Sequence, residues 1–168
     1  MKIFILGISG SGKTFLAKKL SEKLKIKHFD LDNLYWEIKY TKKRDKSKRA
    51  KILDKILEKE SDWIFEGIYN IWTEKIRDEA DLIIWLDMPK NLMTWRILKR
   101  WLKRKKESRE KLKEVLSLIK FQRSYRKYKE KFDGSFYESH KDFLKDFKNL
   151  IIVKNKKDLE EIYKKFGL

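Results

Sequence analysis

Close to its first residue the chain reads Gly7-Ile8-Ser9-Gly10-Ser11-Gly12-Lys13-Thr14. Small residues at this density let a backbone turn wrap closely around a polyanion and point its N–H groups at phosphate oxygens. The lysine and threonine that end the turn supply a positive charge for the terminal phosphates and a hydroxyl for Mg²⁺. This stretch therefore predicts a nucleotide-binding P-loop.

The segments on either side of the turn provide the context that such a motif requires. Residues 2–6 are almost all apolar and predict a buried strand, and residues 14–24 predict a helix. The beginning of that helix adds free N–H groups and a partial positive charge. We expect ATP to be bound by the following residues: Gly7, Ser9, Gly10, Ser11, Gly12, Lys13, Thr14 and Phe15.

Length and composition favour one globular domain over residues 1–168. No apolar run approaches the ~20 residues needed to cross a membrane, and the first residues do not form a signal peptide, so a cytoplasmic location is expected. The absence of cysteine and the presence of only two histidines argue against a structural metal site. Mg²⁺ carried by ATP is the expected metal.

The net charge of +18 and the isoelectric point near 9.8 indicate attraction to polyanions. The polyanion could be a nucleotide, a nucleic acid or an anionic membrane face, and a lysine-rich compositional habit would produce the same charge without any partner. Charge by itself does not choose among these alternatives.

Acidic residues follow two further predicted strands, at residues 26–31 and 62–67. Asp30 and Asp32 lie at the end of the first, and Glu66 lies at the end of the second. Because the carboxyl ends of parallel strands face the ligand crevice, Asp32 is a candidate to orient an acceptor and Glu66 a candidate to hold Mg²⁺ through water. The alternatives are a helix N-cap for Asp32 and an ordinary strand-end carboxylate for Glu66.

The rest of the chain continues to alternate strands with helices. Residues 80–87 and 149–153 predict strands, the charged segment 39–48 predicts a surface connection beside the acceptor pocket, and helices are expected at residues 50–60, 68–78, 91–106, 107–133, 137–147 and 157–166. This alternation predicts an α/β fold with a doubly wound, five-stranded parallel sheet.

The chain resembles the nucleoside monophosphate kinases, a P-loop kinase family. The resemblance rests on the P-loop, on Asp30-Leu31-Asp32, on Glu66-Gly67, and on Leu86-Asp87-Met88-Pro89 followed by Arg96 and Arg100. It implies that one of these two arginines lies against adenine and the other contacts phosphates. It also implies a basic helical lid at about residues 96–130, to which Arg123 and Arg126 would contribute.

The small adenylate-kinase-related proteins called DNA topology modulation proteins are more similar still, at Leu31-Asp32 and at residues 63–69 and 95–100. One departure stands out. Adenylate kinases follow the third-strand acid and glycine with Phe-Pro-Arg, whose arginine binds the acceptor phosphate, whereas this chain continues Ile68-Tyr69-Asn70. The segment between the second and third predicted strands contains other candidates to bind an acceptor, namely Trp36, Lys42, Lys43 and Arg44. The resemblance therefore does not indicate AMP as the acceptor.

The sequence thus predicts an ATP-dependent phosphotransferase acting on a nucleotide or another small acceptor. Its expected catalytic residues are Lys13, Asp32, Arg100, Arg123 and Arg126. The alternatives are a nucleic-acid-associated ATPase or polynucleotide kinase, whose basic helices would follow a DNA or RNA backbone, and a regulator that binds nucleotide without turnover.

Overall fold

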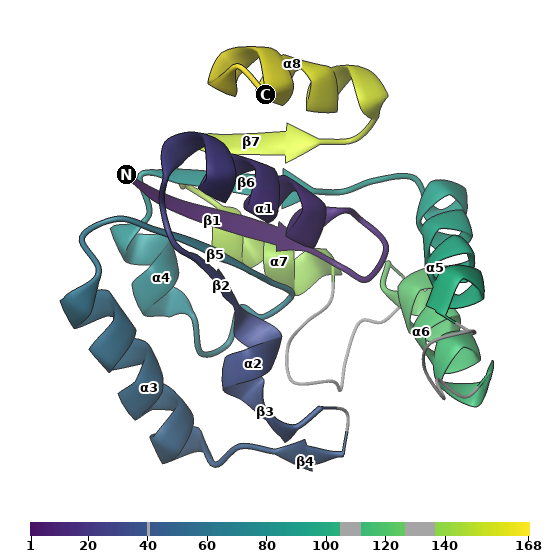
Figure 1. Ribbon diagram of the computed structural model, residues 1–168, viewed down its shortest axis with the longest axis horizontal. Helices are drawn as coiled ribbons and strands as arrows, with labels where there is room; N and C mark the ends of the chain where they lie inside the picture. Colours follow the sequence, from purple (N-terminus) through teal and green to yellow (C-terminus); the bar gives the residue numbers. More distant parts are fainter. Residues whose placement is uncertain (40, 105–111, 127–136) are drawn as a thin grey trace.

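The computed structural model describes residues 1–39, 41–104, 112–126 and 137–168. Its centre is a five-stranded parallel sheet in the order β2-β5-β1-β6-β7 (Figure 1). The strands are β1 (Lys2–Gly7), β2 (His28–Asp30), β5 (Trp63–Gly67), β6 (Leu82–Leu86) and β7 (Leu150–Val153). The predicted doubly wound parallel sheet is confirmed.

Helices cover both faces of this sheet because the strands are apolar on both faces. Ile3 and Ile5 of β1 pack with α1 and α8, whereas Phe4 and Leu6 pack in a second cluster with α3, α4 and α7. Every residue of β5 and β6 is buried. Near-continuous apolar strands of this kind are typical of parallel sheets, whose crossover helices exclude water from both sides.

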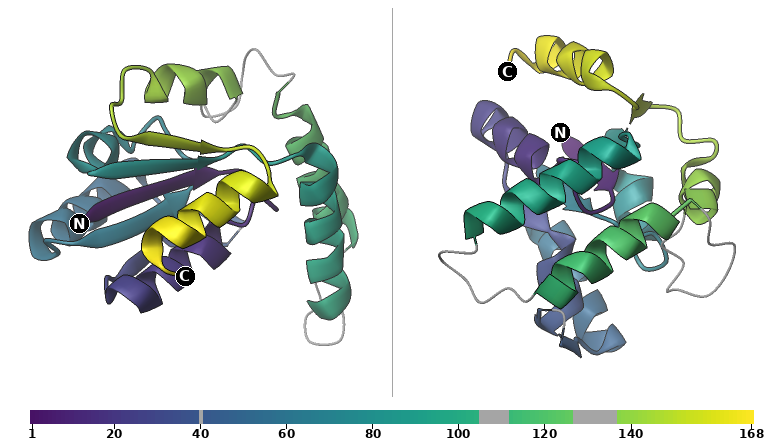
Figure 2. Two further views of the ribbon diagram at one scale, coloured as in Figure 1. Left: turned by 90° about the horizontal axis from the view of Figure 1, so that it is seen from above. Right: turned by 90° about the vertical axis from the view of Figure 1, so that its right-hand side faces the viewer.

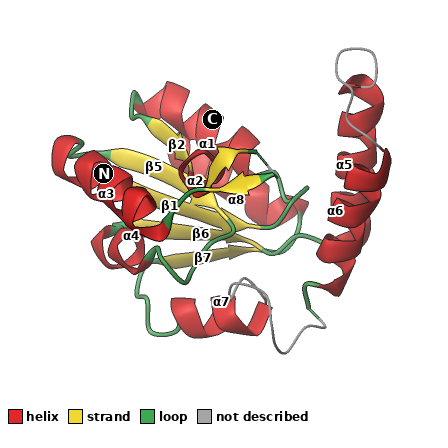
Figure 3. Cartoon of the chain, turned by 90° about the horizontal axis from the view of Figure 1, so that it is seen from below, coloured by secondary structure: helices red, strands yellow, loops and turns green. Residues whose placement is uncertain are grey.

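Eight helices are present in the described part of the chain. They are α1 (Lys13–Leu24), α2 (Leu31–Tyr35), α3 (Lys46–Lys59), α4 (Glu74–Glu79), α5 (Lys90–Arg104), α6 (Leu112–Ser124), α7 (Tyr137–Leu144) and α8 (Lys156–Phe166). The pair α5 and α6 lies side by side beyond the carboxyl edge of the sheet, outside the two helical layers (Figures 2 and 3). This is the region in which the sequence predicted a basic lid, and part of that lid, residues 105–111 and 127–130, lies outside the described residues.

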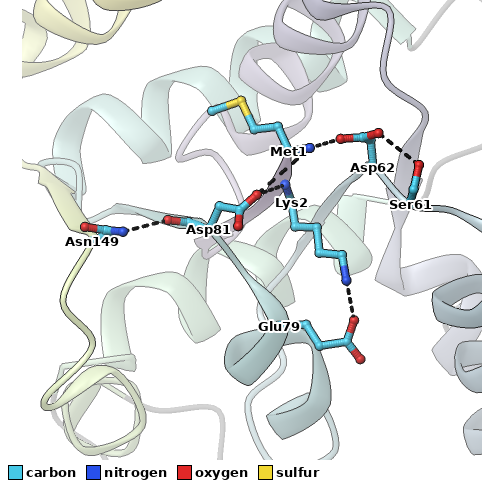
Figure 4. Close-up of polar contacts among 7 residues, drawn as sticks. All are labelled: Met1, Lys2, Ser61, Asp62, Glu79, Asp81 and Asn149. Atoms are coloured by element: carbon cyan, nitrogen blue, oxygen red, sulfur yellow. Dashed lines mark hydrogen bonds and ion pairs between the residues drawn. The ribbon is translucent and has the colours of Figure 1, made fainter.

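Polar contacts join the opposite, amino-terminal edge of the sheet (Figure 4). The amino terminus pairs with Asp62, the backbone N–H of Lys2 donates to Asp81 over 2.7 Å, and Asn149 donates to the Asp81 carbonyl over 3.1 Å. These bonds link the beginnings of β1, β5, β6 and β7. These contacts are explained by their structural role in joining the strands. The candidate functional residues therefore lie at the carboxyl edge of the sheet.

The structure corrects several predicted element boundaries. A short antiparallel hairpin, β3 (Trp36–Ile38) with β4 (Lys42–Lys43), was not predicted; its second strand lies within the surface connection expected at residues 39–48. Helix α3 begins four residues earlier than predicted because Asp45 accepts hydrogen bonds from the N–H groups of Ser47 and Lys48. Residues 68–73 are not helical, and α4 begins only after Thr73.

No helix in the described ranges is both long enough and apolar enough to cross a membrane.

Candidate functional site

The predicted P-loop connects β1 to α1 in a conformation that requires glycine. Gly10 and Gly12 have φ angles of +84° and +100°, which side chains rarely permit. A Cβ atom on Gly10 would lie 2.6 Å from the carbonyl oxygen of Met93, and one on Gly7 would lie 2.6 Å from Ser11 Oγ. No side chain caps the beginning of α1, and its first turn contains no acidic residue. The free N–H groups there suit a phosphate.

Three of the predicted residues meet directly behind this loop. Thr14 Oγ1 donates a 2.7 Å hydrogen bond to Glu66 Oε1, and Lys13 Nζ lies 3.5 Å from Glu66 Oε2. Glu66 belongs to β5, which pairs with β1, so the sheet itself brings the acid to the loop. Glu66 is fully buried although it carries a charge.

The environment of Glu66 holds it as a carboxylate. Burial raises its pKa, but contacts with His28, Lys13 and Thr14 outweigh burial and leave the pKa below the ordinary value. His28 Nε2 lies 3.7 Å from Glu66 Oε1, which is too long for a hydrogen bond. Sequence reasoning did not single out His28; its place two residues before Asp30, on the same side of the strand, was the available signal.

These residues fit a hydrated Mg²⁺ ion. Glu66 Oε2 is buried without a hydrogen-bond partner among the described residues, and an oxygen in that state can accept from metal-bound water. The Thr14 hydroxyl is the hard oxygen next to it. We therefore take Thr14 and Glu66 as the residues that would hold the ion, the glutamate acting through water.

Asp30 and Asp32 have different roles at the end of β2. Asp30, not Asp32, is the N-cap of α2: its Oδ1 accepts from the N–H of Asp32 over 2.9 Å. Burial raises the pKa of Asp30, and the charge of Glu66 raises it further. Asp32 Oδ1 instead accepts a 2.8 Å hydrogen bond from the hydroxyl of Tyr69. The N-cap alternative is therefore wrong for Asp32, whose carboxylate is held in a fixed place by a side chain.

The arginines of the predicted lid are distributed over different environments. Arg96 Nη1 donates to the carbonyl oxygens of Ser11, at 2.7 Å, and Gly10, at 3.4 Å, so it contacts the back of the P-loop. Arg126 is paired with Asp87 at 2.5 Å and lies against the ring of Tyr137. Arg100 and Arg123 are exposed. In this conformation only Arg96 touches the loop, and the phosphate contacts of the others stay predictions.

A cleft of about 800 Å³ lies between α2, the hairpin, α3 and the segment that precedes α4. Lys43 and Arg44 line it, as does Lys46, so the segment predicted to border a pocket does border one. Arg44 itself is held by the carbonyl oxygens of Asn33, Leu34 and Trp36. Lys42 is paired with Glu37 at 2.9 Å. These two cations are therefore engaged within the hairpin region.

A family model described as an AAA domain matches residues 3–117, which include the P-loop, Glu66 and Arg96. The chain belongs to that AAA domain family. A relative, the uncharacterized protein YqaC of Bacillus subtilis, is 38% identical over 95 residues, which cover 56% of this chain and 53% of YqaC. The match therefore spans about half the length of that relative.

Solved structures share the fold of this AAA domain. A gluconokinase from Sinorhizobium meliloti aligns with a TM-score of 0.57 at 12% identity, over 98% of this chain and 88% of its own. A shikimate kinase from Bacteroides thetaiotaomicron aligns with a TM-score of 0.53 at 17% identity, over 100% of this chain and 99% of its own. The fold is thus that of P-loop kinases, while the narrower resemblance to adenylate kinases and DNA topology modulation proteins stays an expectation.

A second histidine, His140, has a structural role that the sequence did not predict. It is fully buried, its Nε2 donates to the carbonyl oxygen of Ile68 over 2.6 Å, and its Nδ1 accepts from the hydroxyl of Tyr125. It therefore ties α7 to the end of α6 and to the residue after Glu66-Gly67. No local sequence pattern predicts this role of His140, because its hydrogen-bond partners are 15 and 72 residues away in the sequence.

Proposed function

We propose that this chain transfers the γ-phosphoryl group of ATP to a hydroxyl group of a small-molecule acceptor. The observation that carries the proposal is the meeting of Lys13, Thr14 and Glu66 behind a glycine turn at the carboxyl edge of the sheet. Phosphoryl transfer needs mainly positioning and neutralisation of charge, and this arrangement supplies both.

Each residue then has a defined task. Lys13 neutralises charge on the transferring group, and the loop N–H groups bind the other phosphate oxygens. Thr14 and Glu66 would hold Mg²⁺, which would neutralise charge on the phosphate oxygens. As the acceptor oxygen forms its bond to the γ-phosphorus, the bond from that phosphorus to the ADP oxygen breaks. The hydroxyl proton passes to Asp32, whose carboxylate Tyr69 keeps in place. A phosphate acceptor would need no such base.

Support for a small acceptor comes from the cleft that is lined in part by Tyr69, the hydrogen-bond partner of Asp32. Structural neighbours are described as a gluconokinase, a sugar kinase and shikimate kinases, one of them in complex with shikimate. At this level of identity they support the fold, and the chemistry proposed for this chain rests on its own residues.

The test is transfer from radiolabelled ATP to a panel of sugars, hydroxy acids, nucleosides and nucleoside monophosphates. At least one acceptor is expected to become labelled, and Lys13→Ala is expected to reduce labelling by a factor on the order of 10² or more, because a transition-state charge contact is lost. Lys18→Ala is the matched control, since Lys18 is an exposed lysine on the same helix and should leave labelling unchanged. Equal labelling by the Lys13→Ala and unmodified proteins would refute the assignment.

A further inference from the structure

A buried arginine without an anionic partner lies in the wall of the cleft. Arg49, in the first turns of α3, is only 7% exposed. Its guanidinium lies against two aromatic rings, with Cζ 4.7 Å from the centroids of both Tyr35 and Trp72. Stacking of this kind offsets part of the cost of burying a cation, but it uses none of the five N–H donors.

Arg49 differs in this respect from two arginines whose charge is already engaged, one half-buried and one exposed. Arg44 donates to three backbone carbonyl oxygens, and Arg126 pairs with Asp87. Within the described ranges, no carboxylate or carbonyl oxygen accepts from the guanidinium of Arg49. A buried charge is normally paired, because removal from water is expensive. The partner of Arg49 therefore lies outside the described residues, and a bound ligand could supply it.

The acidic residues that line the cleft do not pair with Arg49. Asp45 caps α3 and accepts from Ser47 and Lys48, and Asp54 pairs with Lys75 at 2.5 Å. Glu74 is exposed at the beginning of α4. Five basic and only three acidic residues line the cleft, so its charge favours an anion.

The cleft also has the size and the wall of a small-molecule site. Its volume of about 800 Å³ falls in the range of ligand pockets, roughly 300–1,000 Å³. Tyr35 and Tyr69 stack in its wall, with ring centroids 4.6 Å apart. The hydroxyl of the same Tyr69 holds Asp32, so this wall reaches the residue proposed to meet the acceptor hydroxyl.

We propose that Arg49 binds an oxyanion group of the acceptor, a carboxylate or a phosphate, and that the acceptor is therefore a small organic anion. The proposal rests on the function proposed above, whose acceptor class it specifies. The planar guanidinium can donate two parallel hydrogen bonds to such a group, and the rings of Tyr35 and Trp72 fix its orientation. The acceptor would be anchored at Arg49 while its hydroxyl is presented near Asp32.

Anion binding can be measured without turnover. The protein is first saturated with Mg²⁺ and a non-hydrolysable ATP analogue, and the measurement is repeated in a Lys13→Ala background, so that the P-loop does not report as the anion site. Inorganic phosphate, phenyl phosphate and benzoate are then titrated, with tryptophan fluorescence and thermal unfolding as readouts, since Trp72 touches Arg49.

At least one probe is expected to bind and to raise the unfolding temperature. Arg49→Met should weaken that binding roughly 10- to 100-fold, the loss expected for charge-assisted hydrogen bonds, and Arg49→Lys should weaken it less. Lys75→Met is the matched control: it removes a cation from the same cleft, but one already paired with Asp54, and should leave affinity nearly unchanged. Binding of the phosphates alone would identify a phosphate-bearing acceptor, and binding of benzoate alone a carboxylate.

Stability without a probe separates a binding role from a structural one. Removing an unpaired buried cation should leave the unliganded Arg49→Met protein as stable as the unmodified one, or more stable. Absence of binding by every probe, or equal binding by the Arg49→Met and unmodified proteins, would overturn the inference. ATP-dependent labelling that persists in either case would leave the proposed function standing, whereas anion binding without any labelling would leave Arg49 as an anion site and refute the transfer.

Discussion

At the scale of single residues, the protonation state of His140 affects stability. Burial lowers its pKa to about 4, and both ring nitrogens are already used by Ile68 and Tyr125. The ring is therefore neutral in the folded protein and would have to lose a bond to gain a proton. An ordinary histidine titrates near 6.5, so the unfolded chain takes up this proton first as the pH falls.

This difference predicts a pH-dependent stability. The contribution of His140 is fully present above about pH 6.5 and is lost as the pH falls toward 4, because the unfolded state binds more protons in that window. The maximum loss is on the order of 3 kcal/mol, from about 1.4 kcal/mol per pKa unit. Urea unfolding at several pH values should show this slope in the unmodified protein and a flatter one in His140→Gln. Equal slopes in the two proteins would contradict the prediction, whatever their absolute stabilities.

Arg96 is a second residue whose role depends on its contacts. Its guanidinium donates to the carbonyl oxygens of Gly10 and Ser11, so it ties this part of the P-loop to α5. The resemblance to nucleoside monophosphate kinases implied contact with adenine or phosphate at this position. The structure instead gives Arg96 a positioning role toward the loop, and nucleotide contact stays a prediction.

At the scale of elements, α5 and α6 form a unit that is attached to the site through few side chains. Arg96 joins α5 to the P-loop, and Thr94 donates to Gln122 of α6 over 2.9 Å. At the end of α6, Tyr125 and Arg126 bond to His140 and Asp87. The pair thus contacts the P-loop through Arg96, and the two residues directly after α6 contact α7 and Asp87, the residue after β6.

This arrangement predicts that nucleotide protects the two helices. With Mg²⁺ and a non-hydrolysable ATP analogue, hydrogen exchange should slow in α5 and α6, because closure over phosphates would bring Arg100 and Arg123 from solvent into contact. Helix α4, which packs in the cluster on the other face of the sheet from α1, is the internal control and should not change. Exchange in α5 and α6 that is identical with and without the analogue would argue against a lid and for a fixed surface.

At the scale of the whole molecule, the net charge of +18 is the property that most needs a functional test. Exposed residues such as Lys99, Arg100 and Lys103 give α5 a basic outer face. A chain with this charge will bind DNA or RNA at low salt through counterion release whatever its function. Binding alone therefore does not separate a small-molecule kinase from a nucleic-acid-associated ATPase or polynucleotide kinase.

Coupling between the binding of ATP and the binding of nucleic acid distinguishes these functions. For a small-molecule kinase, nucleic-acid affinity should fall by roughly 10³ to 10⁵ between about 50 and 200 mM salt and should be the same with and without ATP. For a nucleic-acid enzyme, ATP must change nucleic-acid affinity or nucleic acid must change ATP turnover, since linked sites couple reciprocally. The test is to measure nucleic-acid affinity and ATP turnover near physiological salt, each with and without the other ligand. We expect no coupling, and mutual coupling would overturn the small-acceptor proposal.

The sequence by itself determined the P-loop, the parallel sheet and the acid behind the loop. These features depend on local patterns. The loop needs positive φ angles that glycine adopts readily, as Gly10 and Gly12 do, and a continuous apolar strand such as residues 82–86 is buried on both faces. Glu66 could be predicted because strand ends in a parallel sheet share one edge. Its contacts with Lys13 and Thr14 then follow from the pairing of β5 with β1.

Only the tertiary structure decided which charged residues are engaged and which are free to bind a ligand. In a chain with 44 lysines and arginines, no spacing marks Arg49 as the buried one, because Tyr35 and Trp72 reach it from segments 14 and 23 residues away. The same holds for Arg44, which the hairpin carbonyls occupy, and for Arg126, which Asp87 occupies. Burial and pairing are properties of packed neighbours, and packing brings together residues that the sequence keeps apart.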